Sequence, residues 1–182
     1  MMRNFRNIYR VVVIALLLVC SAQLSHARKW SVSTNALSWL NMGTINAEAA
    51  CSINDKWTLN TGFVANPWEM HTPTYVNLRN RQYGGYVGAK YWPWHAFSEW
   101  WVGAKVQYKN FEQVGLLTSD LKKGDAVGAG VSAGYALMIS DNFNIDFGVG
   151  IWGGHIFNFN DKERSGNFIF LDNLSVSIAY IF

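Results

Sequence analysis

The strongest constraint on the fold is the strict alternation of side chains at the end of the chain. Residues 174–182 alternate apolar residues with Ser or Ala and finish on Phe182. Successive side chains of a β-strand point to opposite sides, so the apolar residues share one face. The segment is therefore predicted to be a strand with one apolar face, which the fold has to keep away from water.

The same period of two recurs in seven earlier segments, and no segment has a convincing helical period. The eight predicted strands cover about residues 30–40, 43–53, 56–65, 82–92, 99–111, 126–139, 143–156 and 174–182. Their connections alternate between short turns and longer loops, except for the first hairpin, which is short. The longer loops run through about residues 66–81, 112–125 and 157–167. Short turns at one rim and longer loops at the other are typical of membrane β-barrels.

The N-terminal end has the features of a secretory signal peptide. Three arginines in the first ten residues precede an apolar run over residues 11–19, and a small-x-small cleavage site ends at Ala27. The run is shorter than the roughly 20 residues that a membrane-spanning helix needs. We therefore expect residues 1–27 to be removed and residues 28–182 to form the folded domain.

Removal of the signal peptide changes both the charge and the cysteine content. The full chain has 15 Lys and Arg against 12 Asp and Glu, and three of those bases lie before residue 28, which leaves twelve of each. A neutral mature chain gives no reason to expect a nucleic-acid partner. Cys51 is then the single cysteine, expected as a small apolar residue. Lipidation of Cys20 is the weaker alternative to cleavage after Ala27, because Val19 stands where a lipobox needs a small residue.

These patterns predict an all-β fold, an eight-stranded antiparallel up-and-down transmembrane β-barrel. Every predicted strand has an apolar face, and no predicted helix or second sheet exists to cover those faces. In a closed barrel the faces contact lipid, and every backbone N–H and C=O is paired within the wall. A soluble barrel or sandwich with an aromatic core is the alternative.

The last strand also resembles the closing strand of bacterial outer-membrane barrels. Its terminal Phe182 and the aromatic Tyr180 two residues earlier resemble the signal that the barrel-insertion machinery reads. The resemblance implies the outer membrane of a Gram-negative bacterium as the location. Outer-membrane lipid and lipopolysaccharide would then surround the barrel.

Aromatic residues gather near the predicted strand ends, as they do in the interfacial girdles of membrane barrels. The expected girdle at the short-turn rim consists of Trp57, Tyr91, Trp100, Phe143, Tyr180 and Phe182. The expected girdle at the opposite rim consists of Phe111, Phe157, Phe159 and Phe168.

The order and spacing of several short motifs are similar to a Bacteroidota outer-membrane family known as domain of unknown function 3575. The motifs are Thr34-Asn35-Ala36-Leu37, Asn66-Pro67-Trp68, Lys90-Tyr91-Trp92, Ala96-Phe97, Gly128-x-Gly130, Gly134-Tyr135, Asn142-Phe143-Asn144-Ile145 and Gly148-Val149-Gly150. The resemblance implies an eight-stranded barrel of the OmpX and OmpA-barrel type, and a link of some relatives with surface fimbrial systems. It implies no catalytic or ligand-binding residues.

Four charged residues fall on the faces expected to point into the barrel, namely Glu48, Lys90, Lys105 and Asp146. Eight strands enclose an interior that side chains just fill, and an uncompensated charge there would be costly. We therefore predict an internal network of ion pairs and hydrogen bonds. The alternative is a solvated polar track with catalytic or conducting properties.

Other candidate chemical sites are weak, and no cofactor or metal site is expected. His155 with Glu163 and Ser165 could form a hydrolase set, but their spacing fits no barrel-hydrolase motif. His71 with Glu69 provides only two ligands for a metal ion.

The longer loops are the more promising functional part. Trp68, Met70 and Tyr75 are predicted to pack over the rim or to form a contact surface. The expected function is a non-enzymatic structural or surface-interaction role, with a surface or fimbrial protein as a possible partner. The alternative is an outer-membrane barrel enzyme acting on lipid or lipopolysaccharide, or a carrier of small apolar ligands.

Overall fold

The protein is described by a computed structural model over residues 29–40, 43–67, 69–71, 77–114, 121–157 and 166–182. These residues form nine β-strands and one helical turn. The elements are β1 (Trp30–Asn35), α2 (Ala36–Leu40), β2 (Ile45–Asn54), β3 (Trp57–Asn66), β4 (Glu69–His71), β5 (Asn77–Tyr91), β6 (Glu99–Val114), β7 (Leu121–Met138), β8 (Phe143–Phe157) and β9 (Gly166–Ile181).

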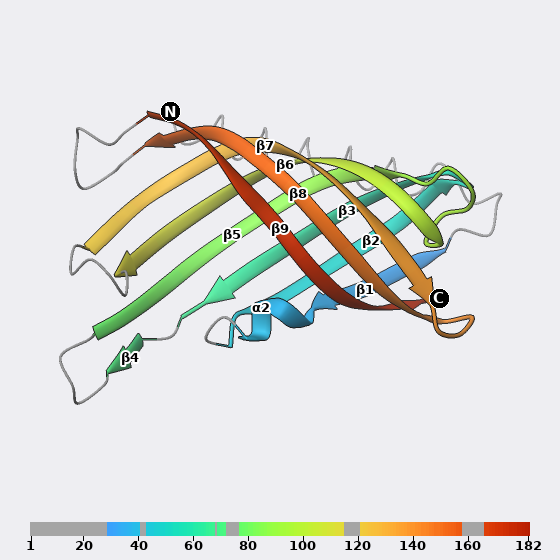
Figure 1. The fold of residues 1–182 in the computed structure, drawn as a ribbon, viewed down its shortest axis with the longest axis horizontal. Helices are drawn as coiled ribbons and strands as arrows, with labels where there is room; N and C mark the ends of the chain where they lie inside the picture. Colours follow the sequence, from blue (N-terminus) through green and yellow to red (C-terminus); the bar gives the residue numbers. More distant parts are fainter. Residues whose placement is uncertain (1–28, 41–42, 68, 72–76, 115–120, 158–165) are drawn as a thin grey trace, which may run out of the picture.

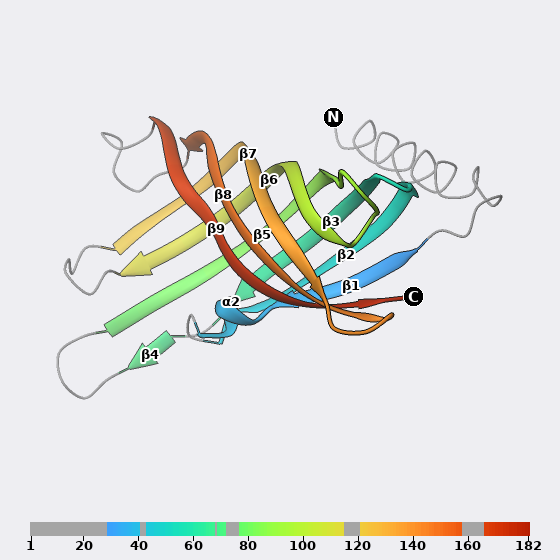
Figure 2. The same ribbon diagram turned by 45° about the vertical axis from the view of Figure 1, so that its right-hand side comes forward.

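Eight of these strands close into one antiparallel barrel with strongly tilted strands (Figure 1 and Figure 2). The strand order is β3-β2-β1-β9-β8-β7-β6-β5, and pairing of β3 with β5 completes the ring. The short β4 pairs with residues 77–79 of β5, beyond the part of β5 that pairs with β3. The predicted all-β, eight-stranded antiparallel barrel is therefore confirmed. In the described part of the chain, no helix is long and apolar enough to cross a membrane.

The two rims of the barrel differ in how the strands are connected. At one rim, which we call the turn end, short turns join β2 to β3, β5 to β6 and β7 to β8. Both ends of the described barrel also meet there, because Trp30 and Phe182 exchange backbone hydrogen bonds of 2.8 and 2.9 Å. The connections β3–β5, β6–β7 and β8–β9 lie at the opposite rim, which we call the loop end.

The alternation of side chains sorts the wall into an apolar outer face and a mixed interior. Aliphatic and aromatic residues of all eight strands are half exposed on the outer face, for example Val87, Val106 and Val131. Residues of opposite parity point inward and are covered, for example Thr58 and Gln82. An apolar outside around a partly polar inside is the arrangement of a barrel surrounded by lipid.

Several strands are longer than the sequence pattern indicated. β5 begins at Asn77 instead of 82, β7 at Leu121 instead of 126, and β9 at Gly166 instead of 174. Backbone pairing continues into polar residues beyond the apolar band, since a ladder needs only N–H and C=O groups. In β9 the period is also hidden, because the inward Phe168 and the outward Ile169 are both apolar and because the register with β8 shifts between Leu171 and Asn173.

The first predicted strand, by contrast, is too long. It was expected to run to residue 40, but β1 ends at Asn35 and the helical turn α2 follows. The side-chain oxygen of Asn35 accepts the backbone N–H of Leu37 at 3.0 Å, which is the contact of a helix N-cap. The Asn before an Ala-Leu pair was the available sequence signal for this helical start.

An aromatic cluster fills the barrel at the turn end, and we call it the aromatic floor. The connection between β5 and β6 folds Phe97 inward, so that its ring lies 5.9 Å from that of Trp92, which lies 6.3 Å from that of Trp101. Ala50, Ala136 and Ile181 complete the cluster. The left-handed backbone of Phe97, with φ of 68°, is part of this inward turn. The floor leaves little space for water or ions at this end.

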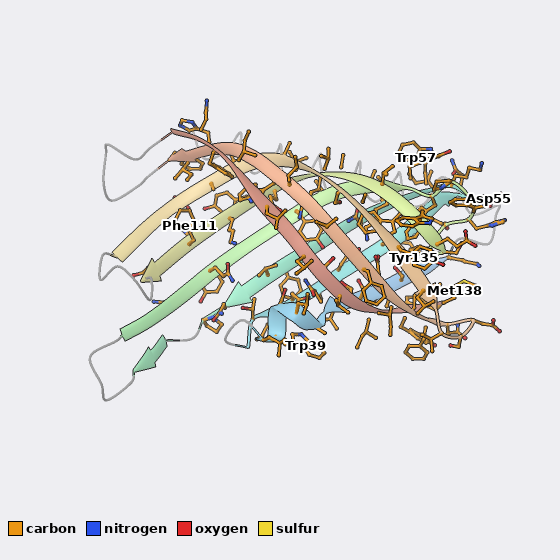
Figure 3. All side chains as sticks on the ribbon, viewed as in Figure 1. Trp39, Asp55, Trp57, Phe111, Tyr135 and Met138 are labelled. Atoms are coloured by element: carbon orange, nitrogen blue, oxygen red, sulfur yellow. The ribbon has the colours of Figure 1, made fainter. Side chains whose placement is uncertain are left out.

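The predicted aromatic girdles are found at one rim and are partly wrong at the other. At the turn end, the ring pairs Trp57–Tyr91, Phe143–Tyr180 and Tyr180–Phe182 have centroids 5.1, 5.0 and 6.0 Å apart. All of these side chains are exposed except Tyr91, which is half-buried. Trp57 lies on the outside in Figure 3. Phe111 and Phe168 do not face lipid. They pack inside the barrel around Trp152, whose ring lies 4.5 Å from that of Phe168.

Removal of a floor residue tests whether this packing stabilises the barrel. Trp92 is 2% exposed and donates through Nε1 to Thr58 Oγ1 at 3.1 Å, whereas Trp94 in the same turn is 51% exposed. We expect Trp92→Ala to lower the free energy of unfolding by about 3–5 kcal/mol. The control Trp94→Ala should change it by less than about 0.5 kcal/mol. Urea unfolding in lipid vesicles, followed by circular dichroism, measures both; equal effects would contradict the assignment of the floor.

Candidate functional site

The structure brings three of the four predicted interior charges into direct contact. Lys90 on β5 places its Nζ 3.1 Å from Glu48 Oε1 on β2 and 3.4 Å from Asp146 Oδ2 on β8. These strands lie on different sides of the ring, so the lysine bridges the barrel interior. All three side chains are largely covered, with 14–19% of each exposed. We call Glu48, Lys90 and Asp146 the ionic triad.

Each carboxylate of the triad also accepts hydrogen bonds from neutral groups. Glu48 Oε2 accepts from the Tyr86 hydroxyl at 2.6 Å and from Asn60 Nδ2 at 3.0 Å. Asp146 Oδ1 accepts from Trp101 Nε1 at 2.8 Å. The ammonium of Lys90 lies 4.4 Å from the centroid of the Trp101 ring, within cation–π range. The buried charges are thus compensated both by each other and by donors.

Two glycines make room for these partners. Gly62 on β3 is directly opposite Tyr86 on β5, and a Cβ on Gly62 would lie 2.5 Å from the tyrosine ring. A Cβ on Gly134 would likewise lie 2.5 Å from Trp101. Without a side chain at these positions the rings lie flat against the wall and reach the carboxylates. The role of Tyr86 was not predicted from the sequence; the available signal was an inward Tyr on one strand opposite a Gly on the next.

Lys105, the fourth predicted residue, lies beside the triad. It is on the inward face of β6, and its Nζ lies 5.0 Å from the centroid of the Tyr86 ring. The ring thus touches Glu48 through its hydroxyl and faces Lys105 with its π-surface. Lys105 therefore adds a fourth charged residue on the loop-end side of the triad; we call these four residues the charged layer.

The interior differs sharply on the two sides of the triad. Toward the turn end, between the triad and the aromatic floor, a space of about 20 Å³ remains, enough for about one water molecule. Toward the loop end there is a cavity of about 310 Å³, which we call the vestibule. Its lining includes Gln82, Gln107 and Lys109 in addition to the charged layer. The barrel thus has a packed base at the turn end and a cavity on the other side of the triad.

The remaining predicted site residues are not brought together in the described part of the chain. His155 is exposed on β8, where Nδ1 lies 3.2 Å from Asn167 Oδ1, and Glu163 and Ser165 lie outside the described residues. Trp68 and Tyr75 also lie outside them, while Met70 is in β4 opposite Leu78. No group of three or more possible metal ligands is found among the described residues.

The predicted insertion signal lies at the turn end of the wall. Tyr180 is opposite Phe143 on β8 and opposite Val32 on β1, so the strand carrying it is paired on both sides. Tyr180 and Phe182 point outward, with ring centroids 6.0 Å apart and nearly parallel rings. Whether they are read as a signal stays a prediction.

Breaking the ionic triad tests its contribution to stability. Glu48→Ala leaves Lys90 with one carboxylate and Tyr86 without its acceptor, so we expect a loss of about 3 kcal/mol in the free energy of unfolding. Asp141→Ala, in the exposed turn between β7 and β8, is the control and should be nearly neutral.

Urea unfolding in lipid vesicles measures these free energies, and it also separates the contribution of the Glu48–Tyr86 hydrogen bond from that of general packing. Tyr86→Phe should cost about 1 kcal/mol in the wild-type background and almost nothing in the Glu48→Ala background, because the hydroxyl then has no carboxylate to bond. Equal costs in both backgrounds, or a Glu48→Ala barrel as stable as the wild type, would argue against a stabilising network.

Comparison with known proteins adds two observations to this geometry. The fold is similar to the crystal structure of the N-terminal β-barrel domain of Pseudomonas aeruginosa OprF, with 10% identity and a TM-score of 0.48. It is also similar to the crystal structure of Neisserial surface protein A (NspA), with 16% identity and a TM-score of 0.43. In both cases the match covers 85% of this chain and 95% of the other. No curated protein matches the sequence.

A family model gives the second observation. The model described as "Protein of unknown function (DUF3575)" matches residues 12–182, which include the whole barrel. The chain with this closed eight-stranded barrel therefore belongs to the DUF3575 family.

Proposed function

We propose that this protein is an integral, non-enzymatic barrel of the outer membrane of a Gram-negative bacterium, and that it acts through contacts at its loop end. The observation that carries the proposal is the outer face. Large apolar side chains project from each of the eight strands of the barrel, and in the described residues no second layer covers them. Lipid is the environment in which such a surface is stable.

The interior supports a structural rather than a conducting role. The ionic triad links β2, β5 and β8 across the barrel, and the aromatic floor packs the space between it and the turn end. Eight-stranded barrels are filled by side chains, whereas aqueous channels need about twice as many strands. In this proposal the triad stabilises the barrel by linking three of its strands from the inside, and Lys105 on β6 is part of the same interior network.

The proposed orientation follows the usual arrangement of such barrels, with the turn end in the periplasm and the loop end outside. Tyr180 and Phe182 at the turn end then act as the signal for the barrel-insertion machinery. The membrane lipid and lipopolysaccharide surround the wall. The loop-end connections, which carry Trp68, Met70 and Tyr75, contact a surface partner such as a fimbrial protein; no nucleic-acid partner is proposed.

A second candidate function is binding of a small ligand. The observation in its favour is the vestibule of about 310 Å³, a volume at the lower end of the range of small-molecule pockets. An enzyme acting on lipid has less support, since the described residues bring no nucleophile, base and carboxylate together.

Cysteine labelling in intact cells tests the location and orientation. In a Cys51→Ala background, Lys123→Cys places a thiol in β7 near the loop end, and Asp141→Cys places one in a turn at the turn end. A membrane-impermeant maleimide should label the first in intact cells and the second only after lysis. Labelling of both thiols in intact cells, or of Asp141→Cys alone, would overturn the proposed orientation.

Loop replacement tests the surface role. We expect a barrel whose residues 72–76, 115–120 and 158–165 are replaced by Gly-Ser segments to reach the outer membrane in normal amounts, because the paired wall is untouched. In the native bacterium it should show the same loss of adhesion or surface-fibre display as a gene deletion. A loop-replaced protein that restores the wild-type phenotype would exclude the loops as the functional part.

A further inference from the structure

The last strand of the barrel has a free edge over its loop-end half. β1 pairs with β9 only over Ser177–Ile181, because β1 ends at Asn35. In the described part of the chain, residues 166–174 of β9 therefore have β8 as their one strand partner. We call the side of residues 167–171 that faces away from β8 the open edge of β9.

The hydrogen bonds near the turn end show how the backbone groups of β9 alternate. Trp30 and Phe182 exchange backbone hydrogen bonds, so Phe182 points its N–H and C=O toward β1. Every second residue before it does the same, because alternate residues of a strand pair with opposite neighbours. The N–H of Val176 follows this pattern and donates to Asn35 Oδ1 at 3.2 Å.

The part of β9 before Leu171 has the opposite parity, because the register with β8 shifts just after this residue. The carbonyl oxygen of Phe168 lies on the β8 side, 2.9 Å from where a Cβ on Gly153 would stand. Its neighbours in the strand point the other way. The N–H and C=O groups of residues 167, 169 and 171 therefore point out of the open edge.

The side chains at the open edge show that no described element lies beside it. Ile169 and Leu171 are 79% and 70% exposed, whereas the outward Val106, Val131 and Ile151, which have strands on both sides, are 50–58% exposed. Leu171 is the register partner of Ile151, so the difference between these two reflects the missing neighbour. The edge thus combines backbone groups that lack a described strand partner with aliphatic side chains.

The helical turn α2 lies beside β9 but covers a lower part of it (Figure 2). Asn35, just before α2, is level with Ser177 of β9. The five residues of α2 rise about 7.5 Å, which corresponds to two or three residues of a strand. α2 therefore reaches no further than about residue 174 and leaves the open edge free.

We propose that the open edge of β9 is a docking site for an extended polypeptide segment of another protein, which adds to the barrel wall as a short strand. The segment runs antiparallel to β9, in the direction of β1, and exchanges backbone hydrogen bonds with residues 167, 169 and 171. Its outward residues are aliphatic and lie beside Ile169 and Leu171. This inference rests on the membrane location given under the proposed function, and it adds the class of partner and the place of contact.

Lipid alone does not satisfy this edge. Acyl chains match the aliphatic side chains, but they have no groups that pair with N–H and C=O, and unpaired backbone groups are costly in hydrocarbon. A polypeptide strand supplies both the backbone partners and the apolar contact. A free edge with these two properties is a template for pairing with another chain.

A second copy of the barrel does not fit the open edge. Two copies with the same orientation in a membrane are related by an axis along the membrane normal, so their β9 strands run in the same direction. A two-fold axis between parallel strands puts the same residue of both copies at one level with its side chains on opposite faces, but a parallel ladder needs them on one face. Antiparallel pairing would turn one copy upside down. The partner is therefore a different chain.

Peptide binding to the full barrel in lipid nanodiscs tests the site. The probe is a fluorescent, capped seven-residue peptide of alternating Thr and Val, and the matched control is the same peptide N-methylated at every residue. Main-chain hydrogen bonds supply the affinity of an added strand. We therefore expect saturable binding of one peptide per barrel and roughly tenfold weaker binding of the methylated peptide. Empty nanodiscs measure the partition of both peptides into lipid.

A proline on the open edge tests the contact from the side of the barrel. Ile169→Pro removes an N–H that points out of the edge and leaves the hydrogen bonds between β8 and β9 in place, so the barrel should fold and shift on boiling in SDS. Its affinity for the peptide should fall roughly tenfold. Ile169→Val keeps the N–H and should bind the peptide like the wild type.

Several results would overturn the proposal. They are the lack of saturable binding to the wild-type barrel, equal binding of the two peptides, and equal binding of the peptide to folded Ile169→Pro and wild type. Disulfide-linked dimers of Ile169→Cys in a Cys51→Ala background would assign the edge to a second copy. If Ile169→Pro does not fold, the two peptides decide the question on the wild-type barrel. Cysteine labelling in intact cells tests the membrane location separately, so the failure of either proposal is distinguishable.

Discussion

The structure depends on one constraint, which is that backbone N–H and C=O groups in hydrocarbon must be paired within the protein. A sheet satisfies this only by closing, and pairing of β1 with β9 and of β3 with β5 completes the ring. Closure in turn fixes which face of every strand contacts lipid. Strand pairing lapses where β1 ends at Asn35, beside residues 166–174 of β9, and there the side chains of Asn35 and Asn46 take over part of the hydrogen bonding.

A ring of eight strands leaves a narrow interior, and the chain fills it in layers. Bulky aromatic residues at the turn end form the floor, and glycines facing them make the necessary space. Above the floor, the ionic triad joins three separated strands through one lysine. The vestibule begins above this layer. The small circumference of the ring thus determines how the aromatic floor packs, how the interior charges are compensated and where the vestibule lies.

Much of this architecture was predictable, because a period of two is a direct consequence of strand geometry. Residues such as Val102, Val106 and Val131 reveal the wall, and the inward parity of Glu48, Lys90 and Asp146 follows from it. The contacts among these charges were less predictable, since they depend on shear and tilt, which bring β2, β5 and β8 together. Single-strand patterns contain no information on that stagger.

The predictions from the sequence were wrong where the barrel interior is apolar and where the backbone pairing of β1 ends. The inward Phe168 and the outward Ile169 are both apolar, and a register shift between Leu171 and Asn173 reverses the parity of β9, so this strand has no continuous period of two. Phe111 was placed at a lipid interface for the same reason, although it packs inside against the Trp152 cluster. The helical turn α2 is too short for periodicity to reveal, and only its Asn35 cap marks it. Phe111, residues 166–174 of β9 and α2 all belong to the loop-end half of the barrel, where the proposed function also lies.

The most direct test of the account is the gel mobility of the protein from a purified outer-membrane fraction, compared between boiled and unboiled samples in SDS. A closed barrel whose strands are held by backbone hydrogen bonds resists SDS until heated, so the account predicts a band that shifts on boiling. A protein that is recovered in the soluble periplasm and shows no shift would contradict it, because the apolar outer face would then have to be buried against something other than lipid.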